Sequence, residues 1–209
     1  KNAGVVTMEN IYIKNEKLFK NKWQMLIYCL LFIALIGAFI YLGTLDYDDT
    51  LPDNEEFANN FSLVPEDNVF VYANATDALM IANGTKGIVL FGTTNEWVNY
   101  YANIVNKVAK EMGIDKIYYY DFVGNRQDNN GTYEAIVEKL SNYVTYNDYG
   151  TAEIYAPTLL VVSNDKVLLF DTETSFVEGN ISPSEYWNSF NESAKMKELR
   201  NVFSKYLES

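Results

Sequence analysis

The chain has 209 residues, a formal net charge of −12 and no histidine. Its acidity argues against nucleic-acid binding, because contacts to phosphate need a basic surface. The lack of histidine excludes histidine-based catalytic triads and the usual zinc-ligand sets, and the single cysteine, Cys29, excludes an intrachain disulfide, a Cys-x-x-Cys motif and a cysteine metal cluster.

From Trp23 to Leu45 no residue is charged, and lysines precede this stretch in the tail 1–22. As a helix, these 23 residues would reach roughly 35 Å, enough to cross a hydrocarbon core of about 30 Å. Lysine before the stretch and carboxylates after it predict a cytoplasmic N-terminus and an extracellular C-terminal domain. We therefore expect a single-pass anchor in the cell membrane at 23–45. A cleaved signal peptide is the alternative, but its apolar core would be shorter.

Residues 46–66 are rich in Asp and Glu and contain Pro52 and Pro65, a composition typical of a linker. A calcium-binding loop is the alternative reading of the acidic cluster. The glycine and the terminal glutamate of an EF-hand loop are missing, however. We therefore expect an acidic linker at 46–66, no metal site, and one extracytoplasmic domain over 67–209.

The domain is predicted to alternate short apolar strands with helices. Strands are expected at 69–72, 87–91, 116–121, 158–162 and 166–170. Helices are expected at 76–82, 96–112, 132–145 and from Ser182 onward, with a polar loop at 122–131. Ser-Asn-Asp between the last two strands is a hairpin signal. Because helices alternate with strands before a final hairpin, the sequence predicts an α/β sandwich with a mixed central sheet.

Two helix starts match a capping box. Thr93 is expected to be the N-cap of the long helix with Glu96 as its N3 partner, so Glu96 is interpreted as a helix-start residue rather than a catalytic acid. Ser182-Pro-Ser-Glu185 combines a capping box with proline at the first helical position. The C-terminal helix is then expected to have one apolar face, made of Trp187, Phe190, Ala194, Leu199, Val202, Phe203, Tyr206 and Leu207.

Four elements of the domain resemble, in order, membrane-anchored or secreted thioredoxin-like proteins of low-GC Gram-positive bacteria, a group that includes the bacteriocin transport accessory proteins. The four elements are residues 83–92, with Gly-Ile-Val-Leu-Phe-Gly, residues 113–121, with Lys-Ile-Tyr-Tyr-Tyr-Asp, residues 154–158, with Tyr-Ala-Pro-Thr, and residues 171–175, which read Asp-Thr-Glu-Thr-Ser. The resemblance implies a thioredoxin-like fold over roughly 68–178. It also implies a cis peptide bond before Pro157, in a loop that helps active thioredoxins to seat an extended chain.

In that family a Cys-x-x-Cys motif follows the Phe-Gly turn, and its cysteine positions fall here on Glu96 and Asn99. A shift of one residue would place them on Asn95 and Val98. Neither alignment supplies sulfur. Thiol–disulfide exchange needs one thiolate to attack and a second thiol to resolve the mixed disulfide. The chain is therefore predicted to be redox-inactive, to need no cofactor and not to be an enzyme.

The surface around the missing motif is the predicted binding site. The resemblance implies a groove formed by Thr94, Trp97, Ala156, Pro157 and Thr158, where Trp97 is either packed or open to a partner. We expect an accessory subunit that binds another envelope or membrane protein. A peptide-holding chaperone or secretion factor that uses the same groove is the alternative. An enzyme that works through Glu96 is a third hypothesis.

Overall fold

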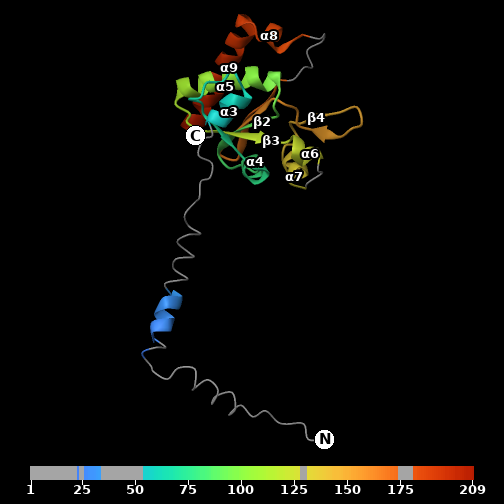
Figure 1. Cartoon of the computed structure of the whole chain (residues 1–209). Coiled ribbons are helices and arrows are strands. Elements are labelled where there is room, and N and C mark those ends of the chain that lie inside the picture. The colour runs from blue at the N-terminus through green and yellow to red at the C-terminus, as the bar shows by residue number, and fades with distance from the viewer. Residues whose placement is uncertain (1–22, 24–25, 34–53, 128–130, 174–180) are drawn as a thin grey trace. The chain divides into compact units, whose positions relative to one another are not determined.

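The computed structural model describes Trp23 and residues 26–33, 54–127, 131–173 and 181–209 (Figure 1). The chain divides into two compact units, Lys1–Asp49 and Thr50–Ser209, and each is described by itself. In the first unit, Trp23 and residues 26–33 are helical. In the described part of the chain no helix has both the length and the apolar character needed to cross a membrane. Most of the expected anchor at 23–45, and the whole tail 1–22, lie outside the described residues.

The second unit is built on a five-stranded sheet with the strand order β1-β3-β2-β6-β7. Its strands are β1 (Phe70–Tyr72), β2 (Gly87–Gly92), β3 (Ile117–Asp121), β6 (Thr158–Ser163) and β7 (Lys166–Thr172). β1 and β2 run parallel to β3, whereas β6 is antiparallel to both of its neighbours. A separate two-stranded ladder joins β4 (Thr145–Tyr146) to β5 (Ala152–Glu153). The predicted mixed central sheet is confirmed.

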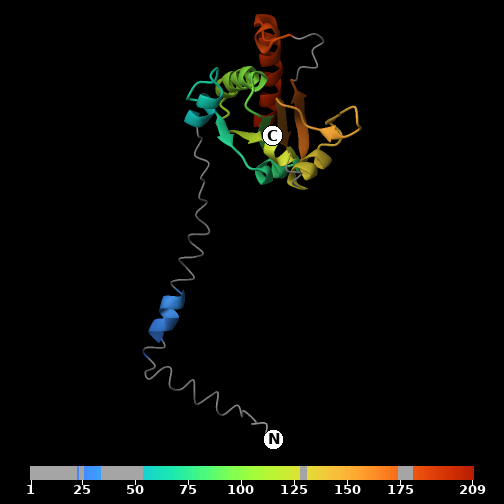
Figure 2. The ribbon, with the colours of Figure 1, turned by 45° about the vertical axis from the view of Figure 1, so that its right-hand side comes forward.

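Helices cover both faces of this sheet (Figures 1 and 2). They are α3 (Asn54–Asn60), α4 (Ala75–Ala82), α5 (Glu96–Met112), α6 (Val123–Gln127), α7 (Gly131–Lys139), α8 (Pro183–Tyr186) and α9 (Ser189–Glu208). On one face α5 packs against α9, and together with α3 these helices supply a large apolar core. On the other face α4 packs against α7 over a second core. The described unit is therefore a mixed α/β sandwich.

Several elements lie where local sequence signals place them. α5 begins at Glu96 and ends at Met112, and Gly113 follows it with a left-handed φ of 77°, which glycine adopts at little cost. The hairpin between β6 and β7 turns through Asn164 and Asp165, whose φ angles are 51° and 58°. Asn and Asp tolerate this region better than most residues. These predictions are confirmed.

Other elements differ from the prediction. α7 ends at Lys139 rather than near residue 145, and the expected polar loop contains the short helix α6. The C-terminal helix is two helices, because Asn188 accepts the N–H groups of Phe190 and Asn191 and so caps a new start after Trp187. The expected buried face of the C-terminal helix is confirmed at Leu199, Val202 and Phe203. It is wrong at Phe190 and Ala194, which are exposed, and Lys195 is buried on the same face.

The second half of the expected linker belongs to the folded domain. Residues 46–53 lie outside the described part, but α3 follows directly and its Phe57 is buried. The Phe57 ring stacks on Phe70 with centroids 4.3 Å apart, and Phe61 contacts Tyr119 edge-on at 5.4 Å. The interpretation of 54–66 as a solvated linker is therefore wrong. Among the acidic and polar residues of this segment, Phe57 and Phe61 are spaced about one helical turn apart and are buried in the core.

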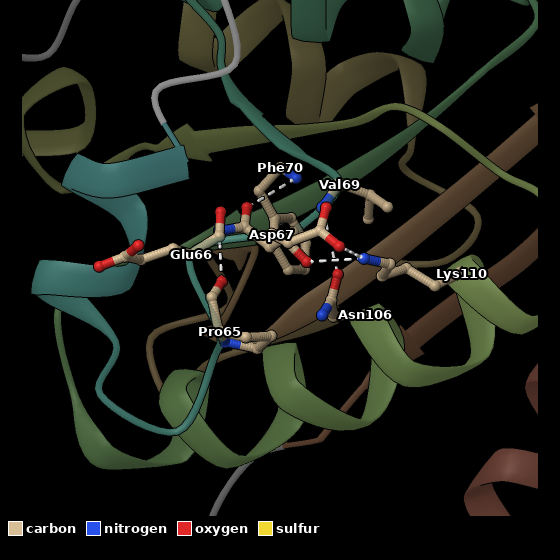
Figure 3. A network of polar contacts seen from close by, with 8 residues as sticks. Pro65, Glu66, Asp67, Val69, Phe70, Asn106 and Lys110 are labelled. Carbon is tan, nitrogen blue, oxygen red and sulfur yellow. Dashed lines mark hydrogen bonds and ion pairs between the residues drawn. The ribbon is translucent and has the colours of Figure 1, made fainter.

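Buried asparagines fix the path from α3 into β1 (Figure 3). Asn68 donates to the carbonyl oxygens of Asn54 and Pro65 at 3.1 and 2.8 Å and accepts the Phe70 N–H at 3.1 Å. On α5, Asn106 accepts the Val69 N–H at 3.1 Å. These amides satisfy backbone groups that would otherwise be buried without partners. The segment before β1 is thereby held against α5.

Candidate functional site

The candidate site lies where β2, β6 and β7 meet the start of α5. Phe91 pairs with Thr158, and Thr158 pairs with Thr172. Pro157 therefore lies between the end of β2 and the end of β7. The Ala156–Pro157 peptide bond is cis, as the resemblance implies. The Glu173 N–H donates to the Pro157 carbonyl oxygen at 3.0 Å.

The start of α5 is capped by Asn95, not by Thr93. The Asn95 side chain accepts the Val98 N–H at 2.9 Å, and Glu96 is the first residue of the helix. The expected capping box is therefore wrong by two positions, because Asn caps a helix at least as well as Thr. Glu96 is exposed in the first turn, where a carboxylate is favoured by the helix dipole.

The other positions aligned with the missing cysteines also have structural roles. Asn99 accepts the Leu63 N–H at 3.0 Å, and its amide donates to the Ser62 hydroxyl at 3.4 Å. Val98 is fully buried in the core. The segment that follows α3 is thus held on the first turn of α5. In both alignments the two cysteine positions therefore fall on residues that cap α5 or form its first turn.

Of the predicted groove residues, only some reach the surface. Thr94 is exposed, and Trp97 and Ala156 are half-buried. Pro157 is buried, and so is Thr158, whose hydroxyl donates to the Tyr155 carbonyl oxygen at 2.6 Å and lies 2.8 Å from the Thr172 hydroxyl. The Thr158 side chain is consequently enclosed by its own strand neighbours. A partner would meet Thr94, Trp97 and Ala156 first.

Helix α8 completes the surface beside Trp97. The Tyr186 ring lies 5.5 Å from the Trp97 ring, and its hydroxyl donates to Glu173 Oε2 at 2.9 Å. A series of contacts therefore runs from the start of α5 through Tyr186 and Glu173 to Pro157. We call Thr94, Trp97, Ala156 and Tyr186 the α5-start surface.

A buried ionic network lies directly behind this surface. The Lys195 ammonium is 2.8 Å from Asp171 Oδ2, 2.6 Å from Glu173 Oε1 and 2.8 Å from Glu198 Oε2. The side chains of Lys195, Asp171 and Glu173 are only 10%, 15% and 13% exposed. The Tyr101 hydroxyl also donates to Asp171. Four separate elements, α5, β7, α8 and α9, thus meet through charge-assisted hydrogen bonds.

The pKa values of Lys195, Tyr101 and Tyr186 are all raised in this network. Burial acts to lower the pKa of Lys195, but the charge of Asp171 and the bonds to all of its carboxylate partners outweigh it, so the pKa lies above its ordinary value. Burial, followed by the charge of Asp171, raises the pKa of Tyr101 well above its ordinary value. Burial, followed by the charge of Glu173, raises the pKa of Tyr186 to about 12. Near neutral pH Lys195 is therefore an ammonium ion held by carboxylates, which suits it to structure rather than to nucleophilic attack.

Sequence reasoning did not identify this network, although one signal was present. Lys195 stands at the i, i+4, i+7 and i+8 spacing shared with Leu199, Val202 and Phe203. A charge on an apolar helix face indicates a buried partner, because an unpaired buried charge is costly. Asp171 and Glu173 lie in one of the elements that carry the family resemblance, but their partners cannot be read from that element.

Two hollows in the described part of the domain lie elsewhere. One of about 400 Å³ is lined by Arg126, Tyr133, Glu134, Val137, Glu138, Thr151, Ala152 and Glu153. Another of about 450 Å³ lies around Gly84, Lys139, Tyr143 and Asp165. Neither includes a residue of the α5-start surface. In the part of the chain that the structure describes, no cluster of carboxylates, cysteines or histidines is placed to hold a metal ion.

No protein-family model matches the chain, and a search of curated proteins finds no match. The candidate site offers a half-buried aromatic pair, the half-buried Ala156 and a buried ionic network behind them. Such an arrangement is suited to holding another polypeptide.

Proposed function

We propose that the chain is a redox-inactive, thioredoxin-like accessory subunit that binds another envelope protein through the α5-start surface. The observation that carries the proposal is the pairing of Thr158, next to Pro157, with Phe91 at the end of the strand that leads into α5. By the resemblance, Glu96 and Asn99 there align with the two positions of a Cys-x-x-Cys motif. Glu and Asn cannot carry out thiol–disulfide exchange. The surface that remains is one that contacts a polypeptide without reacting with it.

Two further features support a thioredoxin-like domain. Its elements follow the order that the resemblance implies: strand, long helix, strand, helix, proline-led hairpin and C-terminal helix. The pairing of β6 with β2 places the proline loop at the end of the strand that leads into the long helix. The proposed fold accounts for both features.

The proposal also includes a membrane anchor at 23–45, with the domain on the extracytoplasmic side. The uncharged sequence of this stretch and the lysines before it support such an anchor. An anchored domain would meet its partner at the membrane surface. Protease treatment of intact cells tests the topology, because an external domain is degraded while a cytoplasmic one is protected.

Site-specific cross-linking in the native membrane tests the binding function. A photoreactive phenylalanine analogue at Thr94 is expected to form a discrete adduct with one envelope protein. The same analogue at Met80, which is 50% exposed on α4, a helix of the other apolar core than that of α5, is the matched control. Equal labelling from both positions, or recovery of the chain alone after mild detergent extraction, would contradict the proposal.

A further inference from the structure

We infer that Glu173 is a positioning residue for the α5-start surface, an inference that rests on the proposed binding function. Glu173 contacts the Pro157 loop through its main chain and α8 and α9 through its side chain. Its main-chain N–H donates to Pro157 O at 3.0 Å, while its carboxylate binds Lys195 Nζ at 2.6 Å and accepts the Tyr186 hydroxyl at 2.9 Å. One residue thereby links the Pro157 loop to α8 and α9.

The environment of Glu173 makes this link rigid. The Glu173 and Lys195 side chains are 13% and 10% exposed, so water competes little for their hydrogen bonds. Tyr186 continues the link to Trp97 through the ring contact at 5.5 Å. Any displacement of Glu173 would therefore shift both sides of the α5-start surface, Ala156 next to Pro157 on one side and Tyr186 with Trp97 on the other.

The other carboxylates of the network lack this double attachment. Asp171 binds Lys195 and Tyr101, which lie in the core behind the surface. Glu198 binds the same ammonium at 2.8 Å, is 47% exposed, and lies three residues from Lys195 on α9. Glu198 therefore offers a matched control, since it has the same charge and the same lysine but no contact with Pro157 or Tyr186 among the interactions shown for the domain.

Hydrogen exchange of the full chain in detergent micelles separates local positioning from general stability. Glu173→Ala is expected to speed exchange about tenfold over 155–158 and 182–187, because the native opening of these segments becomes easier. Glu198→Ala is expected to change these rates less than about twofold, and neither variant should change exchange in β2. Acceleration spread evenly over the whole domain would overturn the inference.

The binding readout uses the photoreactive analogue at Thr94. Glu173→Ala is expected to lower the adduct yield about tenfold while Glu198→Ala leaves it unchanged, since loss of preorganisation weakens binding. An undiminished yield in Glu173→Ala would also overturn the inference. If Glu173→Ala does not fold, Glu173→Gln carries the same test, because it keeps the size and an acceptor for Tyr186 but loses the ion pair.

The two proposals fail in different ways. Absence of any Thr94 adduct in the unmodified chain would contradict the binding function. The exchange rates would still decide whether Glu173 holds the Pro157 loop and α8 in place. Normal adduct formation together with unchanged exchange in both variants would leave the binding function standing and reject the role of Glu173.

Discussion

Lys195 Nζ and Asp171 Oδ2 lie 2.8 Å apart between α9 and β7, with both side chains largely shielded from water. The lysine occupies a position on α9 that an apolar residue would normally take. Its burial is tolerable because carboxylates surround it, and removal of one partner from a buried pair leaves an uncompensated charge. The charge pairs thus hold β7 against α9 behind the α5-start surface.

The Tyr101 hydroxyl is expected to contribute measurably to stability. Tyr101→Phe removes a buried hydrogen bond to the Asp171 carboxylate, a type of bond worth about 1.5–3 kcal/mol. Chemical denaturation of the full chain in detergent measures the change. Tyr100→Phe, the neighbouring tyrosine on α5, is the control and is expected to be nearly neutral. An equal decrease in the free energy of unfolding in the two variants would show that the hydrogen bond to Asp171 does not stabilise the fold measurably.

Stability is expected to fall at alkaline pH. The pKa of Tyr186 is raised to about 12 in the folded protein, mainly by burial, whereas an unfolded tyrosine titrates near 10. The folded state therefore holds the Tyr186 proton more tightly than the unfolded state does, and this difference adds to the free energy of unfolding. The contribution is complete below about pH 10 and is lost as pH rises through about 12. The raised pKa of Lys195 acts in the same direction.

Denaturation midpoints between pH 8 and pH 12 test this dependence. Tyr186→Phe should show a shallower decline than the unmodified chain over about pH 10–12, since it lacks one of the titrating groups. Tyr149→Phe, which removes a hydroxyl that is almost fully exposed, should decline as the unmodified chain does. Identical slopes in all three proteins would exclude Tyr186 as a source of the effect.

The segment before β1 is expected to be essential for folding. Phe57→Ala should cost about 3–5 kcal/mol, because its ring is fully buried between Phe70 and Tyr119. A chain that begins at residue 67, the boundary predicted from composition, should fail to fold cooperatively for the same reason. The measurement is a thermal melt followed by circular dichroism. Glu55→Ala, at an exposed position of α3, should be almost neutral.

Gly92 is expected to tolerate no side chain. A Cβ there would lie 2.5 Å from Tyr119 Cε2, and Tyr119 is enclosed by Phe57, Phe61 and Tyr72. Gly92→Ala should therefore cost about 1–3 kcal/mol by overpacking. Gly124→Ala in α6 meets nothing within 4 Å and should stabilise by about 0.5–1 kcal/mol. Denaturant midpoints compare the two, and equal effects would reject the steric argument.

The cap of α5 gives a prediction that separates two positions. Asn95→Ala should cost about 1 kcal/mol, because the Val98 N–H loses its acceptor. Thr93→Ala should cost much less, since the helix begins after Asn95. Thermal melts of both variants decide between them, and a larger loss for Thr93→Ala would restore the capping box expected from sequence. Glu96→Gln should change stability only slightly.

Local signals in the sequence were sufficient for many individual elements. The apolar spacing of α5 and the glycine after it lie within one segment, so the helix could be predicted with both of its ends. The cap was misassigned because Thr93 and Asn95, two positions apart, have similar capping ability, and the choice depends on where the chain leaves β2. For 54–66, composition concealed the amphipathic pattern that tertiary contacts use.

By itself, the sequence determined the alternation of strands and helices, the uncharged stretch at 23–45, and the presence of a single cysteine at position 29. Only the tertiary structure decided that Lys195 lies inside and that Asp171, Glu173 and Tyr101 meet it. Tyr101 and Asp171 are 70 positions apart, and no local periodicity encodes which helix packs against the end of β7. Residue types and spacing dictate local structure, whereas the pairing of buried charges depends on how distant elements pack together.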